Sequence, residues 1–452
     1  MKLKNILLAF ICFSLLACTK YLDVKPDQRL SVPGKLADLQ ALMENYTVLN
    51  NATMGVSESS ADNYYLTYTD WASVTDDNFK RLYTWEKDNV IPQANSLNEW
   101  YYTYQGIYYA NTVLENIGKI KPIAADTAQW KNVLGQALFY RGRYFLHALS
   151  VWALAYDEKT ATKDMGIPLR LNSNFNEQNI RASLEQSYQQ VIKDLKEAAI
   201  NLPVITSTPV RPNKAAAYGF LARMYLNMRK YNEAGLYADS CLQLYNKLLD
   251  FNTLNASASY PISQFNQEVI FEFGAGAPSL VNNSKAKIDT ILYKLYESND
   301  LRKTINFKKN NDGSYGYFGS YENNVNLFAG IATDEMYIIR AESSARAGNT
   351  SGAVTDLNTL LLKRYKTGTY INYTETDAAK VLEKVLAERR KELVMRDLRW
   401  MDIKRLNKEG YNIKQTRILN GITYELPPND LRYALAIPED VIALSGIQPN
   451  PR

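Results

Sequence analysis

Three segments of the chain repeat a spacing of small and aromatic residues that is typical of paired helices. Within 213–245, Ala222 is followed by Tyr225, Ala234 and Cys241, a spacing that lets two helices of a tetratricopeptide-like hairpin pack closely. A looser version of the pattern occurs in 334–364, and a further hairpin is expected in 134–203. The sequence therefore predicts a mostly α-helical fold. Because alanine spacing is a weak signal, unrelated helical hairpins are the alternative.

The stretch 377–407 has a second strong helical pattern. Val381, Val385, Leu393 and Trp400 belong to an apolar series at spacings of mostly three and four, which predicts one long helix with a buried stripe. Arginine and acidic residues occupy much of the remaining surface. They could form a solvated face, or their planar guanidinium groups could hold neighbouring segments through paired bonds to carboxylates. We expect this Arg-rich helix to be structural.

Two segments lack helical periodicity and mix aromatic with amide side chains. The first is the loop from Asp62 to Trp85, and the second lies in an irregular excursion over about 251–330. Such loops on a rigid scaffold often carry binding groups. Aromatic rings pack against the C–H face of a sugar, and amides bond to hydroxyls or to a peptide backbone. The candidate ligand-binding residues are Asn63, Tyr64, Tyr65, Trp71, Tyr315, Tyr317 and Tyr321. The alternative is that these rings pack the N-terminal segment onto the hairpins.

The first residues have the arrangement of an export signal. Lys2 and Lys4 precede an apolar run that is too short for an ordinary membrane span, and Leu15-Leu16-Ala17-Cys18 looks like a lipobox. We expect residues 1–17 to be removed and Cys18 to be lipidated. Residues 18–31 then form a tether at the start of a single domain spanning 18–452. A plain secretory signal or an uncleaved anchor is the alternative.

Composition and motif content argue against several functions. The formal net charge is +5, without a basic stripe, so no nucleic-acid partner is expected. The chain has no HExxH, Gly-x-Ser-x-Gly or P-loop motif, and its single histidine, His147, is expected to pack in a helix. No cofactor or metal site is predicted. If two carboxylates formed a glycosidase site, Asp62, Asp76 and Asp77 would be the first candidates, although loop aspartates more commonly shape turns.

Several motifs resemble the SusD/RagB family of outer-membrane nutrient-binding lipoproteins. They are Glu388-Arg389-Arg390, Glu392-Leu393, Arg399-Trp400 with Asp402 and Arg405, the lipobox, Tyr108–Asn111, Gly166–Leu169, the AAAYGFLARMYL hairpin, and the tail Ala434–Ile442 with Gln448–Pro451. The family usually carries a Glu-Gly pair shortly before Arg-Trp, where this chain has Arg396-Asp397. The resemblance covers nearly the whole mature chain.

This resemblance implies a SusD-like fold in which helical hairpins support an irregular, loop-rich ligand face. It also implies a non-enzymatic protein, lipid-anchored in the outer membrane and facing the cell exterior. Such a protein captures an oligosaccharide or a peptide and delivers it to a TonB-dependent β-barrel transporter of the SusC/RagA type. Two other classes stay open from the residues alone: a surface-attached hydrolase, and a scaffold that holds protein partners on its repeats.

Cys18 provides the first test. Because two acyl chains anchor a protein stably where one is marginal, the Cys18→Ala variant should leave the membrane fraction. Fractionation with mass spectrometry of the mature N-terminus measures this. Unchanged membrane association of the variant, with no lipid on the native protein, would contradict the prediction.

Overall fold

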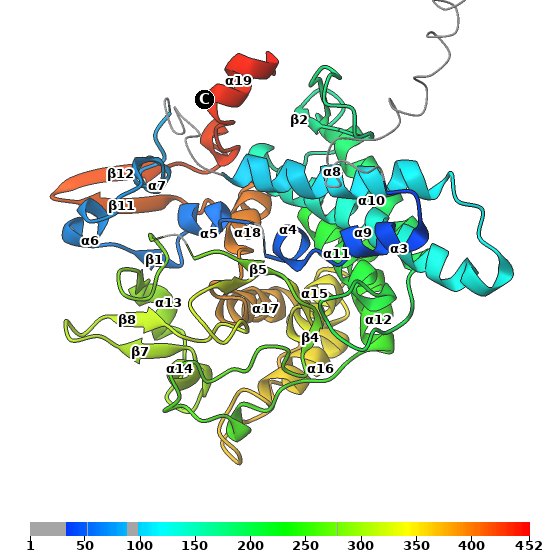
Figure 1. The fold of residues 1–452 in the computed structure, drawn as a ribbon. Coiled ribbons are helices and arrows are strands. Elements are labelled where there is room, and N and C mark those ends of the chain that lie inside the picture. Colours follow the sequence, from blue (N-terminus) through cyan, green and yellow to red (C-terminus); the bar gives the residue numbers. More distant parts are fainter. Residues whose placement is uncertain (1–32, 52, 88–97, 278) are drawn as a thin grey trace, which may run out of the picture.

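The computed structural model describes residues 33–51, 53–87, 98–277 and 279–452, so the expected signal peptide, Cys18 and the tether lie outside the described residues. The predicted mostly α-helical fold is confirmed (Figure 1). The scaffold helices are α8 (Glu99–Ile117), α9 (Thr127–Trp152), α10 (Leu184–Asn201), α11 (Lys214–Asn227), α12 (Tyr231–Leu244), α15 (Thr333–Arg346), α16 (Thr350–Leu361) and α17 (Ala378–Glu392). The other helices are α3 (Leu36–Met43), α4 (Tyr46–Leu49), α5 (Val56–Ser60), α6 (Tyr68–Ala72), α7 (Asp77–Tyr83), α13 (Thr290–Lys294), α14 (Arg302–Ile305), α18 (Arg399–Asn407) and α19 (Glu439–Ser445).

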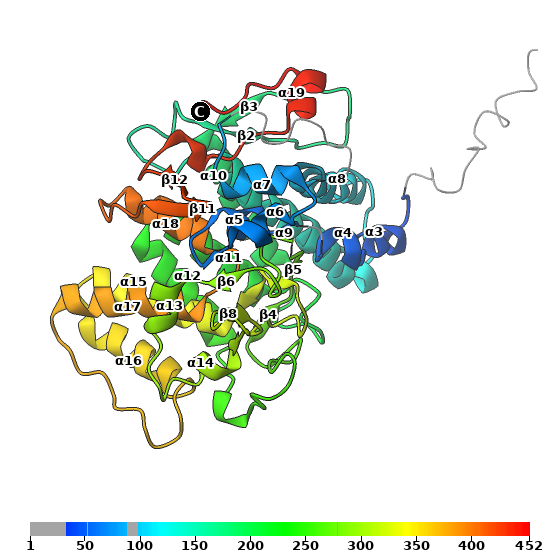
Figure 2. The ribbon, with the colours of Figure 1, turned by 90° about the vertical axis from the view of Figure 1, so that its left-hand side faces the viewer.

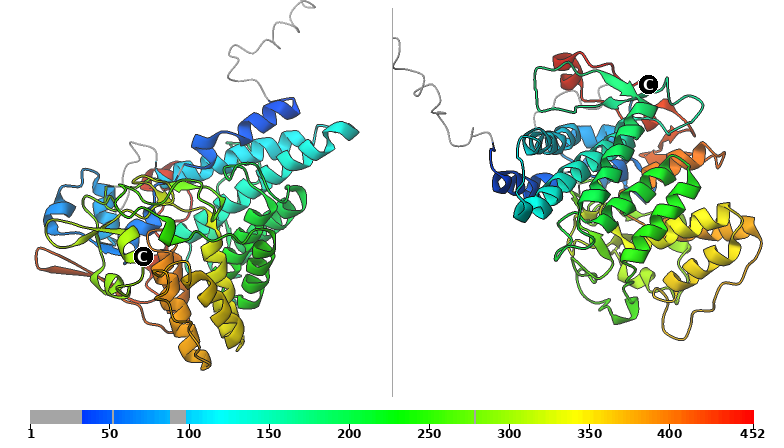
Figure 3. Two further views of the ribbon diagram at one scale, coloured as in Figure 1. Left: turned by 90° about the horizontal axis from the view of Figure 1, so that it is seen from below. Right: turned by 90° about the vertical axis from the view of Figure 1, so that its right-hand side faces the viewer.

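The scaffold helices pack in a row that follows chain order. Each of α8 to α12 contacts the next helix, α12 contacts α15, and α15 contacts both α16 and α17. Figure 3 shows this row on one side of the molecule and the short elements on the other. In the ranges where the sequence predicts hairpins, the chain forms α9 and α10, α11 and α12, and α15 and α16.

Several of these helices begin at a polar residue whose side chain caps the first turn. The Asn98 side chain accepts a hydrogen bond from the Tyr101 amide at the start of α8, and Ser183 forms a capping box with Gln186 at the start of α10. The Asp377 side chain accepts a hydrogen bond from the Lys380 amide at the start of α17. These caps satisfy amides that have no partner within the helix, so local contacts stabilise the first turns.

Glycine permits two of the closest helix contacts. A Cβ atom on Gly106 of α8 would lie 2.2 Å from the Tyr144 ring of α9, and one on Gly235 of α12 would lie 2.8 Å from the Cβ of Ser343 on α15. A larger residue at either place would force the helices apart. The row of helices therefore depends on small residues where neighbours approach most closely.

Short antiparallel strand pairs complete the fold. The pairs are β1 (Tyr64–Tyr65) with β6 (Lys287–Ile288), β2 (Met165–Pro168) with β3 (Arg181–Ser183), β4 (Val269–Phe271) with β10 (Ile331–Ala332), β5 (Gly274–Ala275) with β9 (Leu327–Phe328), β7 (Phe307–Lys309) with β8 (Tyr315–Tyr317), and β11 (Gln415–Leu419) with β12 (Ile422–Leu426). The pair β2–β3 packs against α9 and α10, and the others lie mainly on the opposite side of the molecule (Figure 1). All the strands from β4 to β9 lie in the excursion over 251–330, which lacks helical periodicity. The pairing β4–β10 joins that excursion back to the start of α15.

The prediction of one long helix over 377–407 is wrong. The segment forms α17 and α18, separated by a turn in which Met395 and Asp397 both have φ near +58°. Aspartate adopts this left-handed conformation more readily than most residues, which explains how Asp397 takes the place where the family resemblance leads us to expect glycine. Asp397 also exchanges backbone-to-carboxylate hydrogen bonds with Glu58 of α5, and burial raises the pKa of the Glu58 carboxyl to about 8.

The polar face of α17 is buried in a network of ion pairs. Arg302 bonds to Glu388 and Glu392 of α17, each at 2.7 Å, and also to Asp300. Arg364, after α16, joins Glu392 to Glu268 in the segment before β4. Burial opposes ionisation of Glu388, yet attraction to Arg302 and the neighbouring lysines lowers its pKa well below its usual range. We call Arg302, Arg364, Asp300, Glu268, Glu388 and Glu392 the Arg302 network.

No helix in the described ranges combines the length and the apolar character needed to cross a bilayer.

The Arg302 network predicts a large loss of stability on removal of one partner. Arg302→Ala removes the one cation that bonds to all three buried carboxylates of Asp300, Glu388 and Glu392 and leaves them only Arg364 and nearby lysines. The free energy of unfolding should therefore fall by about 3–5 kcal/mol. Arg211→Ala is the matched control, because the Arg211–Glu44 pair is close to half exposed on both sides and should contribute less than about 1 kcal/mol. Denaturant unfolding followed by circular dichroism measures both. Equal effects of the two variants would contradict the structural role of the network.

Candidate functional site

The two irregular segments that carry the candidate ligand-binding residues meet in space. Strand β1 pairs with β6, with Tyr64 opposite Ile288 and Tyr65 opposite Lys287. The Lys287 ammonium lies 2.9 Å from the Asp70 carboxylate. Strand β6 in turn contacts β8, and Figure 2 shows α6, β6, α13 and β8 gathered on one face. Segments more than 200 residues apart in the sequence thus form one surface.

Three aromatic side chains from the first segment lie at this surface. Tyr65 and Tyr68 are 37% and 48% exposed, and Trp71 is partly buried. The Tyr68 and Trp71 rings are 6.0 Å apart, and the Lys80 ammonium lies 5.8 Å from the Trp71 ring centre. The Trp71 indole N–H donates to the carbonyl of Lys80 at 3.4 Å. One end of Trp71 is thereby fixed while part of the ring stays accessible.

The second segment contributes a stacked pair of tyrosines. The rings of Tyr293 on α13 and Tyr315 on β8 are nearly parallel, with centres 3.8 Å apart. The Lys303 ammonium lies 5.1 Å from the Tyr293 ring centre. We call Tyr65, Tyr68, Trp71, Tyr293 and Tyr315 the aromatic surface.

The other four candidate residues are buried, and three of them hydrogen-bond to the protein itself. The Asn63 amide donates to Glu58, and the Tyr64 hydroxyl donates to the Ser59 carbonyl. Tyr317 is 8% exposed, while the Tyr321 hydroxyl bonds to Glu268 and Asp334. In this structure the four side chains belong to the protein interior. A direct ligand contact for any of the seven residues stays a prediction.

The acidic residues considered for catalysis have structural partners. Asp62 forms a two-pronged ion pair with Arg399, at 2.6 and 2.9 Å. Burial acts against ionisation there, but Arg399 and Arg390 lower the pKa of Asp62 well below its usual range. Asp76 caps α7, Asp77 pairs with Lys80, and His147 bonds to Glu99. These contacts hold loops and helices in place.

No group of three or more histidine, cysteine or acidic side chains within the described parts of the chain is placed to hold a metal ion.

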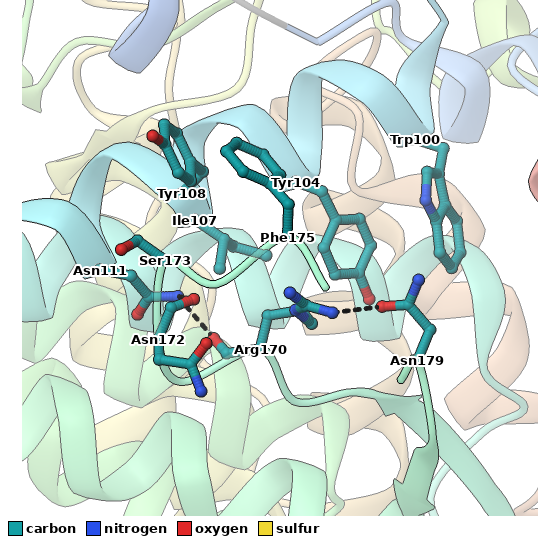
Figure 4. Close-up of a pocket in the computed structure, with 10 residues that line it drawn as sticks. All are labelled: Trp100, Tyr104, Ile107, Tyr108, Asn111, Arg170, Asn172, Ser173, Phe175 and Asn179. Atoms are coloured by element: carbon teal, nitrogen blue, oxygen red, sulfur yellow. Dashed lines mark hydrogen bonds between the residues drawn. The ribbon is translucent and has the colours of Figure 1, made fainter. Parts of the chain in front are cut away.

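A separate pocket of about 190 Å³ lies between α8 and the loop from β2 to β3 (Figure 4). Its lining includes Trp100, Tyr104, Tyr108 and Asn111 from α8, with Arg170 and Phe175 from the loop. None of the residues that line this pocket was among the predicted ligand-binding residues. The signal of the pocket in the sequence was a polar–aromatic series at spacings of three and four along one helix face, which also fits ordinary helix packing. Tyr68 and Tyr293 of the aromatic surface lie in the two segments predicted to bind ligand but were not among the seven predicted residues.

The sequence matches two models of one protein family. Residues 20–226 match the family described as "Starch-binding associating with outer membrane", and residues 333–434 match the one described as "SusD family". No curated protein matches the chain.

Solved structures share the fold over almost the whole chain. A SusD superfamily protein from Bacteroides thetaiotaomicron is 21% identical, with 92% of this chain and 100% of that one covered at a TM-score of 0.75. A SusD-like carbohydrate binding protein from Bacteroides vulgatus is 19% identical, with 91% and 96% covered at a TM-score of 0.65. A laminarin binding SusD-like protein is 17% identical, with 92% and 98% covered at a TM-score of 0.62. With two family models matched over most of its length and this shared fold, the chain belongs to the SusD/RagB family.

Proposed function

We propose that this protein is a glycan-binding lipoprotein of the outer membrane that holds its ligand on the aromatic surface. The family model over residues 20–226 is described as starch-binding and associating with the outer membrane, and two structural relatives are described as binding carbohydrate or laminarin. The observation that carries the site assignment is the exposure of aromatic rings on two segments joined by β1 and β6.

Sugar chemistry fits this surface. The C–H face of a pyranose ring packs on aromatic rings such as Trp71 and Tyr68, and its hydroxyl groups need donors and acceptors at the rim. The carboxylate of Asp70 and the ammonium of Lys80, both partly exposed, offer an acceptor and a donor next to Trp71. A peptide could also use rings and polar groups, but the relatives described as binding carbohydrate favour a glycan.

The protein acts by binding and not by catalysis. Structural contacts account for all three acidic candidates: Asp62 pairs with Arg399, Asp76 caps α7, and Asp77 pairs with Lys80. A captured glycan then needs another protein to cross the membrane. We propose delivery to a TonB-dependent β-barrel transporter, with lipidated Cys18 holding the binding protein at the exterior face.

The aromatic surface yields a binding prediction. Trp71→Ala should weaken binding of a laminarin or starch oligosaccharide by about 30-fold, because truncation of a central aromatic anchor costs about 2 kcal/mol or more. Tyr315→Ala should weaken it less. Tyr411→Ala is the matched control, since that ring is 45% exposed but belongs to neither segment. Calorimetry measures affinity, and circular dichroism confirms folding. Unchanged affinity in both folded variants would place the site elsewhere.

The transporter is tested separately. Affinity purification of the tagged protein in a mild detergent should recover a large β-barrel protein, and deletion of that barrel should abolish growth on the bound glycan. Purification of the protein alone in several mild detergents, with normal growth without the barrel, would contradict delivery.

A further inference from the structure

The pocket between α8 and the β2–β3 loop is lined by two pairs of aromatic rings and by the amide groups of asparagines. Trp100 and Tyr104 stack with ring centres 4.6 Å apart, and Phe175 from the loop faces Tyr108 at 4.7 Å. Figure 4 shows these rings along one edge of the pocket and the amides of Asn111 and Asn172 toward one end. Phe175 is 76% exposed, although burying its ring would be favourable. The exposed Phe175 ring, held beside Tyr108, can pack against the C–H face of a flat ligand.

Arg170 lies in the middle of this pocket (Figure 4), and not all of its N–H donors are used by hydrogen bonds to the protein. Its Nη1 donates to the Glu177 carbonyl and the Asn179 side chain, and its Nη2 donates to the Asn174 carbonyl. A guanidinium has five N–H donors, so two stay without a hydrogen bond within the described ranges. These bonds to neutral oxygens fix the side chain and leave its charge uncompensated.

The charge around Arg170 is also unbalanced. Arg181 on β3 lies close enough to act electrostatically on the same Tyr104 hydroxyl, and within the described residues it donates to carbonyl and amide oxygens. In the described part of the chain, no carboxylate forms an ion pair with either arginine. The carboxylates of the nearby acids bond to other residues of the pocket lining and not to Arg170: Glu115 binds Ser173, and Glu177 binds Asn172. In Figure 4, Ser173 and Asn172 lie at the opposite end of the pocket from Asn179.

We infer that this pocket is a second saccharide-binding site, selective for a sugar ring that carries a carboxylate. The aromatic rings pack against the faces of the sugar ring, and the two free N–H groups of Arg170 donate to its carboxylate as a two-pronged pair. The pocket is of a size for a single sugar ring. This inference rests on the proposed glycan-binding function but uses residues separate from the aromatic surface.

Matched ligands test the selectivity. Calorimetry on the full mature protein in detergent compares tetragalacturonate with its methyl ester, which has the same chain without charge, and includes a hyaluronan tetrasaccharide as a second uronate. We expect at least one uronate to bind about tenfold more tightly than a neutral counterpart, and added salt to reduce the difference.

Matched variants locate the site. Arg170→Gln should abolish the preference for the acid, and Arg170→Lys should restore part of it. Phe175→Ala should weaken both ligands about tenfold without affecting folding, because the ring is mostly exposed. Ile180→Ala is the control, since this side chain is 69% exposed in the same loop but does not line the pocket.

The outcomes separate this inference from the proposed function. Equal binding of acids and neutral counterparts, or uronate binding unchanged by Phe175→Ala and Arg170→Gln, would overturn the second site even if Trp71→Ala abolishes neutral glycan binding. An acidic peptide that binds Arg170 as tightly as the uronate would overturn the assignment to a sugar. Absence of binding to any glycan would overturn both proposals.

Discussion

Burial of the arginine-rich face of α17 is the constraint on which the rest of the structure depends. Arg302 and Arg364 are fully buried, and each bonds to carboxylates from segments that are distant in the sequence. Charges in a protein interior are tolerated only when their partners are held in good geometry. The network therefore fixes the excursion over 251–330 to the helical scaffold at α17. Strands alone could not do so, because the pairs in that region are only two or three residues long.

Arginine side chains that bond to distant segments also position the aromatic surface. Arg399, at the start of α18, holds Asp62 immediately before β1, and Arg417 of β11 donates to the carbonyls of Ser59 and Ala61. The rings of Tyr64 and Tyr83 lie against the Arg417 guanidinium, where cation–π attraction adds to the packing. A loop with little regular structure thus presents exposed rings from a fixed base. Preorganisation of this kind reduces the entropy lost on binding a flexible glycan.

Several features could be predicted from sequence because they depend on neighbouring residues. The periodicity of Val381 and Val385 predicts a helix with a buried face, and both residues are fully buried. The helix break after Leu393 could not be predicted this way, because the apolar spacing continues through it to Trp400. The break depends on Asp397 and its bonds to Glu58, a residue 339 positions away. Likewise, nothing near Tyr321 in the sequence indicates that its hydroxyl bonds to the buried carboxylates of Glu268 and Asp334.

The sequence by itself determined the helical class, the arginine-rich segment and the family, since helical periodicity and short motifs are local properties. Only the tertiary structure decided which tyrosines are accessible. Tyr315 and Tyr317 are two residues apart on β8, yet Tyr315 stacks at the surface and Tyr317 is buried. The tertiary structure likewise brought Arg170 beside Tyr104 and left its charge unpaired by the described acids. Exposure and charge balance depend on contacts between distant segments, and those contacts exist only after the chain has folded.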